Sequence, residues 1–214
     1  MSQTPSAPNE TGLGTGRIMA LADGVFAIVL TLLVLDLHAP AATTNAQLAR
    51  QLKELLPPLL SFVVSFAVVG IFWYGHHMES HWIRRSDRVH LGITLALLLT
   101  ICFVPFSAAL LGRNQQLPVA ASIYGVNLCA AGLVRYGHWV YATRGNRLVD
   151  AGIDPELVRH VRRVFLLVTV LYLLAITIAW LSTIVAIGCF AAIPVLYVIP
   201  ARQTRHLTSL RPAS

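Results

Sequence analysis

Long apolar runs separated by short polar and charged segments dominate this sequence. The first four runs are residues 18–35, 55–74, 91–111 and 117–134, and the fourth is expected to continue to Tyr141. A further apolar stretch, residues 164–200, is interrupted only at Trp180-Leu181-Ser182-Thr183. Because one bilayer crossing takes about 20 apolar residues in helical form, this stretch of about 37 residues predicts two helices joined by a tight turn. The pattern as a whole predicts an all-α integral membrane protein with six transmembrane helices.

Prolines fall where such helices begin or bend. Pro57 and Pro58 stand at the start of the second run, where their missing backbone donors cost little. Pro105 lies inside the third run and predicts a kink there. The first run is longer than the apolar region of a typical signal peptide, so we expect it to stay as a helix.

Basic residues are distributed unevenly between the two sides that six crossings define. Twelve arginines fall in the N-terminal segment, the 75–90 loop, the 142–163 loop and the C-terminal segment. The other two loops hold only three basic residues, Arg50, Lys53 and Arg113. The positive-inside rule therefore places both termini in the cytoplasm. The expected organisation is a flexible cytoplasmic tail (1–16), one six-helix transmembrane domain (17–201) and a second cytoplasmic tail (202–214).

Composition agrees with a protein embedded in a lipid bilayer. The chain is 56% hydrophobic and only 12% charged, whereas soluble domains are about 25% charged. The net charge of +7 could suggest nucleic acid, but the basic residues flank apolar runs and form no nucleic-acid motif. The three cysteines lie inside apolar stretches and are interpreted as small buried residues. We expect a multi-pass protein of the cell membrane that does not bind nucleic acid.

Asp23 is the only charged residue within the first apolar run, and such residues are functional candidates because their burial is costly. The segment around it resembles the first helix of the bacterial transmembrane protein 175 family. That family has an Arg, three residues, Phe-Ser-Asp, and then an apolar stretch containing a Thr. Here Arg17, Asp23 and Thr31 match this pattern. Two later segments are also similar: Phe72-Trp73-Tyr74-Gly75-His76-His77 and Val104-Pro105-Phe106.

The resemblance implies a homotetramer in which four first helices line a central pore for potassium. It assigns Ile28 to a constriction and Thr31 to selectivity. It also implies a structural polar network of Arg17, Asp23, Trp73 and His77. The chain departs from the family in having Leu21-Ala22 in place of Phe-Ser and Thr94 nearest to the Asn often found early in helix 3.

Helical geometry agrees with these assignments. At 100° per residue, Gly24, Ile28, Thr31 and Leu35 fall on one stripe, whereas Asp23 is about 140° away from Ile28. Ile28 and Leu35 could then form an apolar pore constriction, and a ring of Thr31 hydroxyls could replace part of a cation's hydration shell. Asp36, at the outer end of this helix, could form an acidic ring at the outer mouth. The sequence has no Thr-Val-Gly-Tyr-Gly segment, which excludes a carbonyl filter of the usual potassium-channel kind.

Other functions receive less support from the sequence. His77 and His81 have an i, i+4 spacing, but they do not form the His-Glu-x-x-His pattern, so we expect no metal site and no cofactor. A membrane enzyme would need convergent acids, bases or metal ligands, and we expect none. The prediction is therefore a potassium-selective or weakly selective channel for monovalent cations. The alternative is a small secondary transporter of a cation or small solute.

Overall fold

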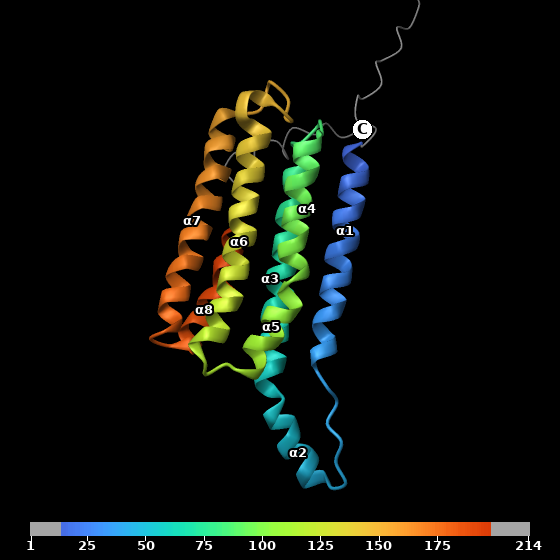
Figure 1. Cartoon of the computed structure of the whole chain (residues 1–214), viewed down its shortest axis with the longest axis vertical. Coiled ribbons are helices and arrows are strands. Elements are labelled where there is room, and N and C mark those ends of the chain that lie inside the picture. Colours follow the sequence, from blue (N-terminus) through green and yellow to red (C-terminus); the bar gives the residue numbers. More distant parts are fainter. Residues whose placement is uncertain (1–13, 198–214) are drawn as a thin grey trace, which may run out of the picture.

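The computed structural model describes residues 14–197, which form a bundle of helices (Figure 1). Short 3-10 segments follow α1, α6 and α8; they are η1 (Leu33–Asp36), η2 (Arg144–Asn146) and η3 (Ile193–Tyr197). The α-helices are α1 (Thr15–Leu32), α2 (Asn45–Glu54), α3 (Leu56–Ser80), α4 (Arg88–Cys102), α5 (Val104–Arg113), α6 (Pro118–Thr143), α7 (Pro155–Ala179) and α8 (Thr183–Ala192).

The predicted all-helical membrane class is confirmed. Five helical segments of the described residues are long and apolar enough to cross a membrane: 15–36, 56–80, 88–113, 118–146 and 155–179. The next apolar segment, Thr183–Tyr197, is shorter. Residues 198–200 of the predicted sixth run, like the predicted tail 202–214, lie outside the described residues. Six crossings and the sidedness of the termini therefore stay predictions.

Several helix boundaries differ from those predicted, and α7 begins at Pro155, well inside the predicted 142–163 loop. Residues 75–80 were predicted as part of a loop, but α3 continues through them to Ser80. This extension is helical although it is polar, because its inward residues His76 and Glu79 are buried against other helices. At the N-terminus, α1 begins at Thr15, inside the predicted tail 1–16. Residues 1–13 of that tail lie outside the described residues.

The predicted kink at Pro105 is confirmed. α4 ends at Cys102, Phe103 separates the two helices, and α5 begins at Val104 with Pro105 in its first turn. A proline has no backbone N–H to continue the hydrogen-bond ladder, and its ring clashes with the preceding turn. The two helices together still form one segment, residues 88–113, that is long and apolar enough to cross a membrane.

Helix α2 was missed because the prediction rested on long apolar runs. It contains ten residues, and Thr44 caps its N-terminus by accepting a hydrogen bond from the Gln47 backbone amide at 3.2 Å. Leu48 and Leu52, spaced i, i+4, lie exposed on one face. The threonine cap and this spacing would have predicted a short amphipathic helix. In Figure 1 it projects from the end of the bundle opposite the start of α1.

The loop between α6 and α7 closes one end of the bundle. Gly145 and Asn146 adopt positive φ values of 62° and 53°, which turn the chain back after α6. Val149 forms an antiparallel bridge with Ile83, and both lie in a small apolar cluster. Arg85 donates hydrogen bonds to the carbonyl oxygens of Asn146 and Val149 at 2.8 and 2.7 Å. The α3–α4 and α6–α7 loops are therefore joined at this end.

Asp87 fixes the start of α4 at the same end. Its carboxylate accepts hydrogen bonds from the His90 backbone amide at 2.8 Å and from the Tyr141 hydroxyl at 2.6 Å. Burial by itself would raise the pKa of the Asp87 carboxyl, but these two hydrogen bonds outweigh it and hold the pKa below its ordinary value. The cap thus keeps its negative charge where the helix dipole favours it.

Candidate pore helix and the buried ion pair beside it

Helix α1 has two different faces. Its inward face, made by Ile18, Ala22, Phe26 and Val29, is buried against the rest of the bundle. The opposite face is uncovered, although it is also apolar: the side chains of Ile28 and Leu35 are 59% and 67% exposed. Figure 1 shows why, since α1 stands at the edge of the bundle. The predicted stripe of Gly24, Ile28, Thr31 and Leu35 lies wholly on this exposed face.

The polar group on this stripe is the Thr31 hydroxyl. It donates a hydrogen bond to the Ile28 carbonyl oxygen at 2.7 Å, one turn back along α1. Because the proton is used within the helix, the lone pairs of Oγ1 remain free to face a cation or water. The stripe thus combines the apolar side chain of Ile28 with the hydroxyl oxygen of Thr31, one turn further along α1.

Asp23 points away from this stripe and is held by α3. The Trp73 indole N–H donates a hydrogen bond to Asp23 Oδ1 at 2.8 Å. His77 stacks on Trp73, with ring centroids 5.7 Å apart. The structure thus brings three of the four predicted network residues together. Arg17 is exposed at the first turn of α1, and the hydrogen bonds and ion pairs of residues 14–197 do not join it to Asp23.

Replacing Trp73 by phenylalanine should destabilise the protein, because the Asp23 carboxylate loses its indole donor. A hydrogen bond to a charged group contributes about 1.5–3 kcal/mol, so we expect the free energy of unfolding to fall by about that amount. Trp180→Phe is the matched control, since Trp180 is 64% exposed at the end of α7. Thermal unfolding of the purified variants in detergent measures the difference. Equal stability of the two variants would show that the Asp23 contact contributes nothing.

Asp36 lies in η1 and is paired within its own subunit. Its carboxylate Oδ1 accepts a hydrogen bond from the Arg113 guanidinium at the end of α5, and its side chain is 20% exposed. This pairing compensates the negative charge that Asp36 could offer at an outer mouth. The contact also joins the end of the candidate pore helix to the α4–α5 crossing.

A buried ion pair that the sequence analysis missed lies between α3 and α6. The Arg135 guanidinium donates to Glu79 Oε1, and their side chains are 1% and 6% exposed. The rings of Tyr197, Phe165 and Phe72 surround the guanidinium at 4.5, 4.8 and 5.6 Å from their centroids. Such aromatic faces attract a cation, so Arg135 is held by a carboxylate and by three rings.

One sequence signal could have revealed a buried partner for Arg135. Arg135 falls within the stretch expected to continue the fourth apolar run to Tyr141, and a charged residue inside such a helix usually has a buried partner. In the structure, Gly75 makes space for the guanidinium. A Cβ atom there would lie 2.5 Å from Arg135 Nη2, so any other residue would force the guanidinium to move.

Comparison with known proteins identifies relatives along most of the chain. Residues 17–105 match the family described as endosomal/lysosomal potassium channel TMEM175. A potassium channel of Streptomyces collinus is 34% identical over 184 residues, covering 83% of this chain and 89% of that relative. A potassium channel of Chamaesiphon minutus is also 34% identical, covering 82% of this chain and 90% of that relative.

A solved structure supports the same relationship. The crystal structure of a lysosomal potassium-selective channel TMEM175 homolog from Chamaesiphon minutus matches with a TM-score of 0.77 and 30% sequence identity. The match covers 86% of this chain and 96% of that chain. The similarity therefore extends beyond α1 to nearly the whole helical bundle. On this sequence identity, coverage and fold, the chain belongs to the TMEM175 family of ion channels.

Proposed function

We propose that this chain forms a cation channel that passes potassium selectively or with weak selectivity. Four copies surround a central pore, and the α1 helix of each copy lines it. The relatives from Streptomyces collinus and Chamaesiphon minutus are named potassium channels, which supports potassium as the permeant ion. The channel lies in the cell membrane with both termini in the cytoplasm, in agreement with the excess of arginines on that side.

The observation that carries this proposal is the uncovered stripe on α1. A lipid-facing surface needs only apolar side chains, but this stripe also contains Gly24 and the exposed hydroxyl-bearing residue Thr31. One subunit supplies one α1, so a pore lined by this helix requires several copies around a symmetry axis. The proposed assembly places Gly24, Ile28, Thr31 and Leu35 along that axis.

The chemistry of the stripe fits passive conduction with a gate. Rings of Ile28 and Leu35 side chains make narrow apolar segments that exclude water when they close. Between them, a ring of Thr31 oxygens offers partial replacement for the hydration shell of a monovalent cation. Side-chain hydroxyls move more than backbone carbonyls, so the expected discrimination between potassium and sodium is modest.

Ion flux from proteoliposomes tests the proposal. Purified protein is reconstituted, and potassium and sodium efflux are recorded over a wide range of ion concentrations. A channel gives passive flux down the gradient that does not saturate at low concentration, whereas a secondary transporter saturates. Saturating flux, or flux that requires a second solute, would favour the small secondary transporter instead.

Thr31→Ala should reduce the preference for potassium over sodium, because the hydroxyl oxygen of the proposed selectivity ring is lost. We expect the permeability ratio to fall by up to about tenfold, which corresponds to about 1.4 kcal/mol of discrimination. Thr31→Ser keeps the hydroxyl and should keep most of the preference. Bi-ionic reversal potentials in planar bilayers give the ratio. An unchanged ratio in Thr31→Ala would remove Thr31 from the selectivity mechanism.

A further inference from the structure

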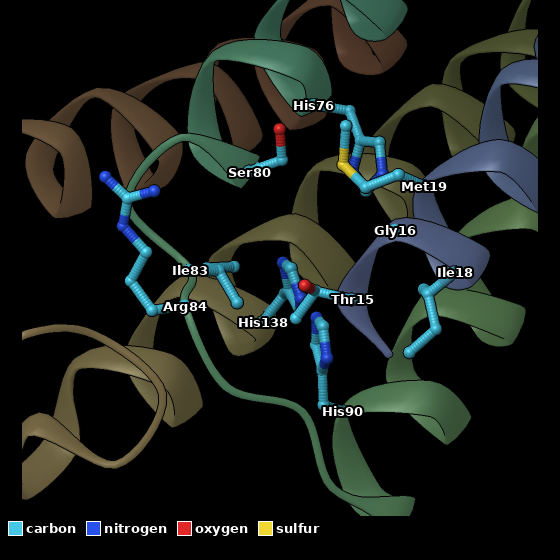
Figure 2. Close-up of a pocket in the computed structure, with 10 residues that line it drawn as sticks. All are labelled: Thr15, Gly16, Ile18, Met19, His76, Ser80, Ile83, Arg84, His90 and His138. Carbon is cyan, nitrogen blue, oxygen red and sulfur yellow. The ribbon is translucent and has the colours of Figure 1, made fainter. Parts of the chain in front are cut away.

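A cavity of about 340 Å³ opens at the end of the bundle where α1 begins. Figure 2 shows residues of α1, α3, α4 and α6 around it, with the side chains of His76, His90 and His138 on its wall. The other lining residues are Thr15, Gly16, Ile18, Met19, Ser80, Ile83 and Arg84. The cavity lies apart from the exposed α1 stripe, so the proposed pore does not use it.

All three imidazoles are buried, and two of them have ring nitrogens without a hydrogen-bond partner. His76 and His138 are 5% and 2% exposed, and neither His76 Nδ1 nor His138 Nε2 has a partner among the described residues. His138 Nδ1 lies 3.5 Å from Glu79 Oε2, on the side where the Glu79–Arg135 pair is buried. Unpartnered polar atoms are costly in a protein interior. These two nitrogens have almost no accessible surface, but both rings line a space large enough for a small ligand.

The third imidazole completes a compact row. His90 stacks on His138 with centroids 4.8 Å apart, and His76 and His138 are 6.3 Å apart. Ser86 Oγ and His90 Nδ1 form a hydrogen bond of 3.0 Å. The other ring nitrogen of His90, Nε2, is therefore left for another partner. The rings of His76 and His90 therefore offer donors to one small region, and His138 packs between them.

The remaining wall of the cavity favours negative charge. Thr15 and Gly16 begin the 18-residue helix α1, whose first turn has no side-chain cap and no acidic residue. Their backbone N–H groups lack partners within the helix, and the helix dipole makes this end positive. Arg84 stands at the mouth, 3.7 Å from Asp150. None of the described lining residues is acidic. Glu79 does not line the cavity, and its charge is paired with that of Arg135.

We propose that this cavity binds a phosphate-type anion. The α1 N-terminus and the imidazole donors would hold its oxygens, and Arg84 would close over it from the mouth. A phosphate group fits the chemistry better than a metal ion, because the described residues contain no group of three His, Cys, Asp or Glu side chains placed to hold a metal. The group could belong to free phosphate or to a lipid headgroup. The inference does not depend on the chain conducting ions.

Two probes distinguish these sources. Isothermal titration of inorganic phosphate into the full-length protein in an uncharged maltoside detergent tests for a free anion. Titration of a short-chain phosphorylated phosphatidylinositol in the same detergent, with short-chain phosphatidylcholine as the control lipid, tests for a headgroup when phosphate is absent. Saturable binding of phosphate supports the site and a free ligand. Binding only to the phosphorylated lipid supports the site and a headgroup.

Matched variants locate the binding. Arg84→Ala and His90→Phe remove lining groups, and each should weaken binding by about tenfold or more, because each loses a charge-assisted hydrogen bond. Arg88→Ala and His160→Phe remove the same residue types from exposed positions outside the cavity and should leave binding unchanged. Equal binding in all four variants would overturn the assignment.

A measurement on the unaltered protein covers the case in which a variant does not fold. Diethylpyrocarbonate modifies accessible imidazoles, and mass spectrometry identifies each modified histidine. The bound probe should slow modification of His76 and His90 at least about threefold, and His160 should not change. Unchanged modification of His76 and His90, or no saturable binding of either probe, would overturn the proposal.

Discussion

Potassium flux through the Ile28→Ala variant should exceed wild-type flux by about tenfold or more. Ile28 is the apolar side chain of the exposed α1 stripe nearest its middle, and four copies would form the dewetted constriction of the proposed pore. Alanine widens this ring and lowers the cost of hydrating it. Each 1.36 kcal/mol removed from the barrier gives a tenfold increase in rate.

The control must remove an equally exposed apolar side chain from another helix. Leu173 on α7 is 53% exposed, which is close to the 59% of Ile28. Leu173→Ala should therefore conduct like the wild type. Proteoliposome efflux with a potassium-sensitive dye, normalised to the amount of reconstituted protein, gives both values. If Ile28→Ala conducts no faster than Leu173→Ala, then Ile28 does not form the barrier.

Glu79→Ala should cause the largest loss of stability. The variant leaves the Arg135 guanidinium buried at 1% exposure without its carboxylate. Breaking a buried ion pair from one side costs about 3–5 kcal/mol, which is comparable to a large part of the stability of many proteins. The aromatic rings around Arg135 attract the guanidinium but cannot replace its ionic hydrogen bond.

Two comparisons separate this effect from a general loss of charge. Glu54→Ala removes a carboxylate that pairs with Arg50 on the surface, with both side chains more than half exposed, and should change stability by less than about 1 kcal/mol. The double variant Glu79→Leu/Arg135→Met removes both buried charges and should recover much of the loss. Reversible unfolding in mixed detergent micelles measures each value. A loss in Glu79→Ala no larger than that in Glu54→Ala would contradict the structural role of the pair.

The helices that the sequence predicted well are those whose length and apolar composition the lipid bilayer requires. A bilayer requires long apolar helices with satisfied backbones, so the runs containing α1, α3, α6 and α7 were visible as composition alone. Pro105 was visible for a similarly local reason, since a proline interrupts a helix wherever it stands. Helix α2 was not visible in this way, because its ten mostly polar residues lie outside the long apolar runs.

The candidate site was predictable in part. The α1 stripe follows from helical periodicity, and the contact of Asp23 with Trp73 was expected from family resemblance. The Glu79–Arg135 pair and the three-histidine cavity depend on which helices become neighbours. An arginine inside an apolar run signals a buried partner but does not say which residue it is, because that depends on the side-chain contacts between α3 and α6 and on the packing of α1 against α4.

The central claim is that the exposed stripe of α1 lines the conducting pathway, and a cysteine at position 28 tests it most directly. In a Cys102→Ser background, which removes the exposed native thiol, Ile28→Cys and Leu173→Cys are reconstituted and treated with a cationic, water-soluble methanethiosulfonate. Mass spectrometry gives the fraction of each cysteine that is modified. Our account predicts that potassium flux through Ile28→Cys falls by about tenfold or more, because a fixed charge at the constriction raises the barrier to cations, while Leu173→Cys is unaffected. Full flux through modified Ile28→Cys would contradict a pore lined by α1.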